Sequence, residues 1–177
     1  MTSKFQIKKT IHYLLFTIHY KRGFTLVELL LFMGIFSIFL IVLTDLFSAI
    51  INTRIESEAT SSVEQDSRFI ISRLAYDIPR ADSITSPALG NSASSLSIVI
   101  GGITYTYQIS SGNFQMTNNL GSNNLNSSET TVSNPIFQRI GNSGGKDTIK
   151  ITFTVNSVTQ KITGSETQNF QITIGRR

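Results

Sequence analysis

The sequence predicts an α+β protein, in which one long N-terminal helix packs against a small antiparallel β-sheet. Two observations lead to this fold class. The first is the stretch from Phe24 to the residue before Pro79, which has no proline and only one glycine, Gly34, and so contains little that would break a helix. The second is a change after Pro79 to short runs of alternating apolar and polar residues, which is the period of β-strands.

Residues 1–23 form a basic leader. They hold five Lys or Arg and no Asp or Glu, a net charge of +5, whereas the other 154 residues hold ten basic and eleven acidic residues, a net charge of −1. The overall charge of +4 therefore belongs to the leader. The rest of the chain offers no basic surplus, so nucleic-acid binding is not indicated. The chain has no cysteine, which excludes disulfides and thiolate metal sites.

A mostly apolar stretch follows the leader and predicts a transmembrane segment over about residues 24–47. The sixteen residues from Leu29 to Thr44 carry no charge. At ~1.5 Å of rise per residue the stretch is long enough to cross a hydrocarbon core of ~30 Å. The basic leader marks the cytoplasmic side by the positive-inside rule, which places the C-terminal part outside the cytoplasm. Asp45 is expected at the outer interface, where water reaches it.

Two simple interpretations of this stretch leave its first acidic residue unexplained. One is a plain single-pass anchor, and the other is a removable secretory signal that is cut near the small residues Ser48 and Ala49. Glu28 lies only four residues after Phe24. A carboxylate in an apolar segment is costly unless it has a partner, and neither an anchor nor a signal core supplies one.

A third interpretation rests on residues 21–28, KRGFTLVE, and the apolar run that follows them. This pattern resembles the processing site of type IV prepilins and type II secretion pseudopilins. The resemblance implies that a prepilin peptidase cuts between Gly23 and Phe24 and then N-methylates the new terminal Phe24. It also implies that Glu28, with Thr25, serves subunit assembly, because the carboxylate can meet the new amine of its own chain or of a neighbour.

The second half of the helix is predicted to be amphipathic and to stop at Pro79, so that the whole helix covers residues 24–78. Apolar or small residues recur on one helical face, at Ile55, Ala59, Val63, Ile70, Leu74 and Ile78. The charged and polar residues between them are expected to form a solvated face: Arg54, Glu56, Glu58, Glu64, Gln65, Asp66, Arg68 and Arg73.

Residues 79–177 are predicted to form a globular β head. A hairpin is expected around Gly101-Gly102, where both residues can take positive φ. Strands are expected at 95–100, 103–109, 114–117, 135–140, 148–155 and 170–174, with a polar loop at 118–134 and a turn at 141–145. One face of the sheet would cover the apolar face of the helix. Pilin-like proteins share a protruding helix and a β head, so the resemblance implies the same layout.

The residue types favour a structural protein over an enzyme. Once the leader is removed, the chain has neither His nor Cys. This excludes triads with a histidine base and metal sites with His or Cys ligands. No catalytic, cofactor-binding or metal-binding residue is therefore assigned, although calcium in the Asn-rich loops stays open.

The resemblance implies a minor pilin or pseudopilin of a type IV pilus or a type II secretion-like fibre. Residues 64–84 loosely resemble minor subunits of the J or W type, and the missing proline in the membrane half of the helix also favours a minor subunit. The implied partners are the prepilin peptidase, other pilin or pseudopilin subunits and the inner-membrane assembly platform. The implied location is the inner membrane, with a single pass and an extracytoplasmic C-terminal domain, and then the fibre. The alternative is a membrane-tethered extracellular binding module, such as an adhesin.

Overall fold

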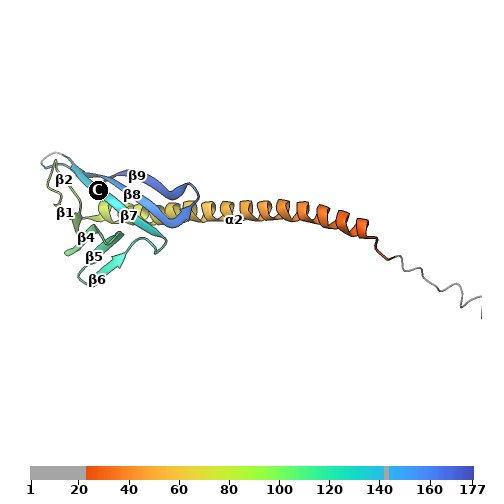
Figure 1. Cartoon of the computed structure of the whole chain (residues 1–177). Coiled ribbons are helices and arrows are strands. Elements are labelled where there is room, and N and C mark those ends of the chain that lie inside the picture. The colour runs from red at the N-terminus through yellow and green to blue at the C-terminus, as the bar shows by residue number, and fades with distance from the viewer. Residues whose placement is uncertain (1–22, 142–143) are drawn as a thin grey trace, which may run out of the picture. The chain divides into compact units, whose positions relative to one another are not determined.

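The computed structural model describes residues 23–141 and 144–177 (Figure 1). One long helix, α2 (Leu26–Asp77, 52 residues), continues into a single 3₁₀ turn, η1 (Ile78–Arg80), and the strands that follow pair antiparallel. The predicted α+β class is therefore confirmed. Of the leader expected over residues 1–23, all but Gly23 lies outside the described residues.

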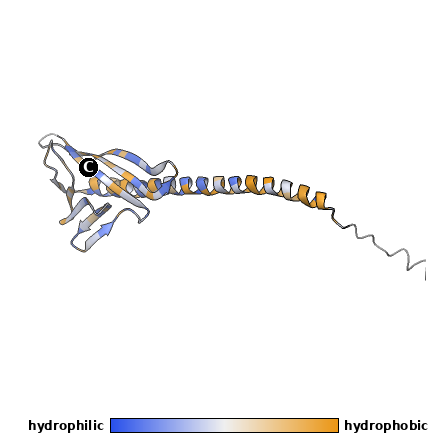
Figure 2. Ribbon diagram, in the orientation of Figure 1, coloured by the Kyte–Doolittle hydropathy of each residue, from blue (hydrophilic) through white to orange (hydrophobic). Residues whose placement is uncertain are grey.

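The first half of α2 is mostly apolar (Figure 2). The helix is long and apolar enough to cross a membrane, and its side chains up to Phe47 are exposed. The chain divides into two units after Phe47, and each unit is described by itself. The helix begins two residues later than predicted, at Leu26, and gives way to η1 at Ile78, just before Pro79.

The second unit, Ser48–Arg177, holds the rest of α2 and two antiparallel sheets rather than the single sheet that was expected. One sheet has the strand order β1-β3-β4-β5-β6 and the other has the order β2-β7-β8-β9. The strands are β1 (Ser83–Ser86), β2 (Ser92–Ala93), β3 (Leu96–Ile100), β4 (Ile103–Ser110), β5 (Asn113–Asn118), β6 (Gly121–Asn124), β7 (Thr130–Ile140), β8 (Thr148–Lys161) and β9 (Gly164–Gly175).

One hydrophobic core joins the helix to both sheets. The helical contribution is the predicted apolar face, of which Val63, Ile70 and Leu74 are fully buried. Phe114 from β5 lies between Phe137 of β7 and Phe153 of β8, with ring centroids 6.2 and 5.8 Å away. Because the aromatic side chains of both sheets meet in this cluster, the head is one packed body around the distal part of α2.

Strand β6 lies inside the segment that was expected to be a polar loop, residues 118–134. Its sequence is Gly-Ser-Asn-Asn, which has no apolar side chain to predict a strand. Side chains help to fasten it to β5: the hydroxyls of Thr117 and Ser122 are 2.9 Å apart, and Gln115 donates to Asn124 at 3.0 Å. The loop prediction is therefore wrong over β6, because polar cross-strand pairs replace apolar ones.

Strand β7 begins at Thr130, five residues before the predicted strand. The first part was not predicted because a bulge interrupts the alternation of apolar and polar residues. Its register with β8 shifts between Ser133 and Ile136. Pro135 lies within this shift and needs no ladder partner there, and Asn134 takes a positive φ of 51°. The bulge puts Val132 and Phe137, an odd number of residues apart, into the same core, which a simple alternation cannot reveal.

Strands β8 and β9 are both longer than predicted, each at the end that leads into their shared turn. The apolar alternation of β8 that gave the prediction ends at Val155, but the strand continues past a register shift to Lys161. β9 starts at Gly164 rather than at residue 170. The expected turn at 141–145 includes residues 142–143, which lie outside the described residues.

Candidate functional site

The predicted cleavage point lies in non-helical backbone ahead of α2. Gly23, Phe24 and Thr25 precede the first helical residue, and Phe24 is 80% exposed. A Cβ built on Gly23 would meet no atom within 4 Å, and its φ is not in the positive region. The described part of the chain therefore places no demand for glycine at this position.

Thr25 and Glu28 are brought together by a helix cap. The Glu28 N–H donates to Thr25 Oγ1 at 3.2 Å, and the Leu29 N–H donates to the Thr25 carbonyl at 3.1 Å. Thr25 is thus the N-cap of α2, and Glu28, three residues on, is the acid of its first turn. This cap was not predicted, although the Thr-x-x-Glu spacing of a capping box was present to indicate it.

The Glu28 carboxylate is left free for a partner outside this part of the chain. Glu28 is exposed, and over residues 23–141 and 144–177 no ion pair involves it. The capping bond uses its backbone N–H and not its carboxylate. One residue can therefore help to start the helix and still present a negative charge beside the terminus that cleavage would create.

The apolar half of α2 satisfies its own hydroxyl groups. Ser37 Oγ donates to the Met33 carbonyl and Thr44 Oγ1 to the Leu40 carbonyl, each at 2.8 Å. Such bonds let polar side chains sit in an apolar medium. Asp45 follows directly and is exposed.

The distal end of α2 carries a buried polar cluster. Asp77, the last helical residue, is 2% exposed, and its Oδ2 accepts a hydrogen bond of 2.5 Å from the Tyr107 hydroxyl. Arg73 Nε lies 2.6 Å from the same oxygen. Burial raises the pKa of Tyr107 above its ordinary value of 10.0, and the bond to Asp77 raises it further. The tyrosine packs in the core, and its hydrogen bond also holds β4 to the end of the helix.

Asp66 corrects the prediction of a solvated polar face. It is 8% exposed, and its Oδ2 accepts bonds from Ser127 N–H at 2.9 Å, Ser127 Oγ at 2.8 Å and Thr130 Oγ1 at 2.5 Å. Asp66 lies three residues after Val63 and four before Ile70, so it belongs to the buried face. One carboxylate oxygen therefore fastens the loop before β7 to the helix.

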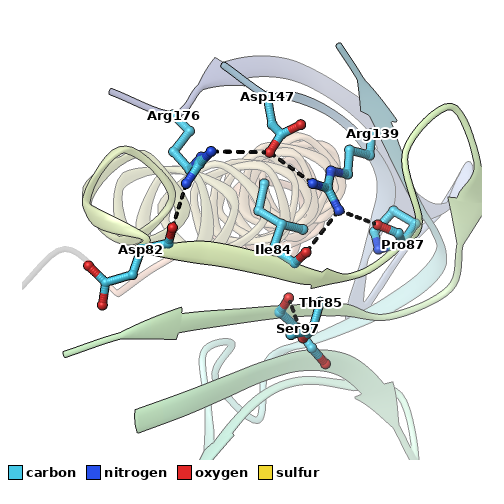
Figure 3. Close-up of polar contacts among 8 residues, drawn as sticks. All are labelled: Asp82, Ile84, Thr85, Pro87, Ser97, Arg139, Asp147 and Arg176. Carbon is cyan, nitrogen blue, oxygen red and sulfur yellow. Dashed lines mark hydrogen bonds and ion pairs between the residues drawn. The ribbon is translucent and has the colours of Figure 1, made fainter. Parts of the chain in front are cut away.

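A third buried carboxylate, Asp147, ties together three distant segments (Figure 3). Its Oδ2 lies 2.9 Å from Arg139 Nη2 and 3.5 Å from Arg176 Nη2. Arg139 also donates to the carbonyl of Ile84 at 2.8 Å, and Arg176 donates to the carbonyl of Asp82 at 2.5 Å. The cluster joins β1, β7 and the segment after β9. The terminal guanidinium nitrogens of both arginines are paired within the cluster, which is the arrangement of a structural brace, whereas their Nε atoms are buried without a hydrogen-bond partner among the described residues.

The described residues hold no group of three or more His, Asp or Glu side chains placed to bind a metal. Their buried acids are instead occupied by hydroxyl, amide and guanidinium donors within the head. Outside these clusters, the described residues include the exposed Gly23–Phe24 junction, the exposed Glu28 and the exposed apolar half of α2. These lie next to one another in the chain.

Comparison with known proteins points to the same stretch of the chain, from the Gly23–Phe24 junction into the apolar half of α2. The family model of the prokaryotic N-terminal methylation motif matches residues 18–44. No curated protein and no solved structure matches the chain. The matched residues contain the junction, the cap and most of the apolar half of α2. The chain therefore carries the prokaryotic N-terminal methylation motif, which is the prepilin-type leader motif.

Proposed function

We propose that the chain is a minor pilin or pseudopilin, a structural subunit of a type IV pilus or a type II secretion-like fibre. It is inserted as a precursor, cut between Gly23 and Phe24, methylated on Phe24 and assembled through α2. The observation that carries the proposal is the motif itself, lying on an exposed, non-helical junction directly ahead of a long apolar helix. In this role the chain needs no catalytic residue and no cofactor.

The motif implies processing by a prepilin peptidase and assembly in the membrane with other pilin-like subunits. We add the inner-membrane assembly platform as a partner, and an orientation in which the head lies outside the cytoplasm. The basic leader supports this orientation through the positive-inside rule. The Glu28 carboxylate, which has no ion pair among the described residues, supports assembly, since it can compensate a terminal amine in a medium of low dielectric.

Two observations support a minor rather than a major subunit. α2 contains no proline along its 52 residues, whereas many major pilins carry one in the membrane half. Residues 64–84 loosely resemble minor subunits of the J or W type, and in this head that region supplies Asp66, Arg73 and Asp77 to the internal clusters. A subunit with a specialised head and a regular helix suits a low-copy position near a fibre tip.

The proposal is tested by the mass of the N-terminal peptide after co-expression with a prepilin peptidase in bacterial membranes. We expect a chain that starts at Phe24 and carries an N-methyl group. Gly23→Leu should abolish the cut, because a side chain would block the approach of the peptidase. Gly34→Leu is the matched control, since a Cβ at Gly34 also meets nothing within 4 Å, and it should be processed normally.

The same spectrum addresses the alternatives. An intact Met1 on a functional protein would favour a membrane-tethered binding module of the adhesin type. A chain that starts after Ala49 would favour a removable secretory signal. Either result would overturn the proposal, because both leave Phe24 without a free amine.

A further inference from the structure

The turn between β8 and β9 presents an exposed isoleucine at the tip of the longest hairpin in the described chain. Lys161 pairs with Gly164, so Ile162 and Thr163 form the turn. Ile162 is 83% exposed, and Val158, near the end of β8, is 54% exposed. A β-branched apolar residue is not what tight hairpin turns favour, since Gly, Asn and Asp fit them better. The turn itself therefore gives no reason for Ile162.

This hairpin tip lies beside the first helical turns of the second unit. Ile162 lines a shallow cavity of about 290 Å³ together with Asn52, Ile55 and Glu56 of α2. Ile50 and Ile51, just before them, are 67% and 42% exposed. Exposed apolar side chains from α2 and from the β8–β9 turn therefore form an apolar rim at the end of the second unit that contains Ser48.

The start of this unit is also the end of the apolar stretch. Ser48 follows Phe47 directly, and Ile55 lies about 10 Å from Ser48 along the helix, at ~1.5 Å per residue. If the apolar half of α2 crosses the ~30 Å hydrocarbon core, Ser48 lies close to the outer surface of the bilayer. The headgroup layer adds ~5–8 Å on each side of the core. The hairpin tip is therefore within reach of that layer.

We propose that the β8–β9 hairpin tip is a second membrane contact, in which Ile162 inserts into the headgroup layer of the bilayer that α2 crosses. The inference rests on the proposed membrane anchoring. Its occupant is a lipid surface, because the apolar rim is continuous in the chain with the membrane segment. Lys161, the one base of the turn, is paired with Glu166 of β9.

The charge of the rim determines the lipid class. Glu56 and Glu58 are exposed on the adjoining helix, and Arg54 is the nearby base. Anionic lipid would therefore gain little from this surface. The contact is apolar, and it should form on zwitterionic vesicles and persist at high salt.

The chain has no tryptophan, so a single introduced tryptophan reports its own environment. The full chain is reconstituted at low density in phosphatidylcholine vesicles whose acyl chains carry bromine near the headgroup. The test variant is Ile162→Trp. We expect a blue shift of its emission and a loss of intensity relative to vesicles without bromine, unchanged by salt. Far-UV circular dichroism and the thermal midpoint should match those of the parent, since the turn is exposed.

Leu120→Trp is the matched control within the head. Leu120 is 88% exposed in the β5–β6 turn. Its neighbour Asn119 lines a cavity with Gly102, and the Gly101 N–H donates to Asp82, just beyond η1. It thus lies near the far end of the head's helix, which extends about 37 Å from Ile55 to Arg80 by the same rise per residue. Its emission should be insensitive to bromine.

Phe36→Trp, inside the apolar half of α2, separates this inference from the anchoring on which it rests. Quenching of Phe36→Trp without quenching of Ile162→Trp would overturn the hairpin contact alone. Absence of quenching in both would overturn the anchoring as well. Quenching of Leu120→Trp equal to that of Ile162→Trp would show a head lying flat on the lipid. A blue shift of Ile162→Trp that appears only at high protein density would show that the tip contacts another subunit and not lipid. Each of these outcomes contradicts the proposal.

Discussion

The Tyr107 hydroxyl donates a 2.5 Å hydrogen bond to Asp77, and both side chains are buried at the point where α2 ends. Tyr107→Phe would remove the donor and leave the Asp77 carboxylate with Arg73 as its neighbour. We expect the free energy of unfolding to fall by about 1.5–3 kcal/mol, the contribution of a hydrogen bond to a charged group. Chemical denaturation of the full chain in detergent measures it. Tyr105→Phe, half-buried on the same strand, should change it little, and an equal loss there would contradict this account.

Alkaline pH should weaken the same contact. Burial and the bond to Asp77 raise the pKa of Tyr107. The unfolded state therefore releases the phenol proton near pH ~10, while the folded state still holds it. Stability is fully present below that pH and is lost as the pH rises above it. Unfolding curves from about pH 8 to about pH 11 should show this decline, and Tyr107→Phe should flatten part of it.

Removing the Asp66 carboxylate should be more costly than removing an exposed acid of the same helix. Asp66→Ala deprives three donors of their shared acceptor, so we expect a loss of about 3 kcal/mol in the free energy of unfolding. Glu64→Ala breaks only the exposed pair with Arg68 and should cost less than about 1 kcal/mol. Similar losses for the two variants would show that the docked loop contributes nothing.

Glu28 has a backbone role and a charge role, which two substitutions can separate. Glu28→Gln keeps a residue that capping boxes accept, whereas Glu28→Ala does not. If the charge serves assembly, both variants should be cut after Gly23 yet fail to enter fibres, as judged by immunoblots of sheared filaments. Asp45→Asn is the control and should assemble. Assembly of either Glu28 variant at the parent level would refute the charge role.

The cap can be tested in the same way. Thr25→Ala removes the side-chain oxygen that accepts the Glu28 N–H, and Thr25→Ser retains it. We expect faster amide exchange in the first turn of α2 for the alanine variant, equivalent to about 0.5–2 kcal/mol of local stability. Serine should restore most of the protection. A loss of fibre entry without a change in exchange would instead assign Thr25 to a contact with another subunit.

The helix and one hairpin were predictable because their signals are local. The apolar spacing from Val63 to Leu74 and the stop at Pro79 identify the amphipathic half of α2. The Gly101-Gly102 pair identifies the β3–β4 turn, and both glycines take positive φ as expected. Strand β7 was predicted only in part, since the bulge at Pro135 reverses its alternation.

The candidate site shows the same division. The residues around Gly23 could be found because the motif is contiguous. The burial of Asp66 depends on Ser127 and Thr130, which lie 61 and 64 residues further along the chain. Local charge pattern favours a solvated Asp66, and no short window contains the partners that bury it.

The long sequence separation between Asp66 and its partners also affects the order in which parts of the protein can fold. The bonds of Asp66 close a long loop, and contacts of this kind form slowly because the intervening chain must first lose its freedom. During synthesis, the segment Ala59–Leu74 emerges well before the strands that cover it. Until those strands are synthesised, the apolar face of this segment stays exposed. Any factor that protects the nascent chain must therefore cover that face until residue 130 has been made.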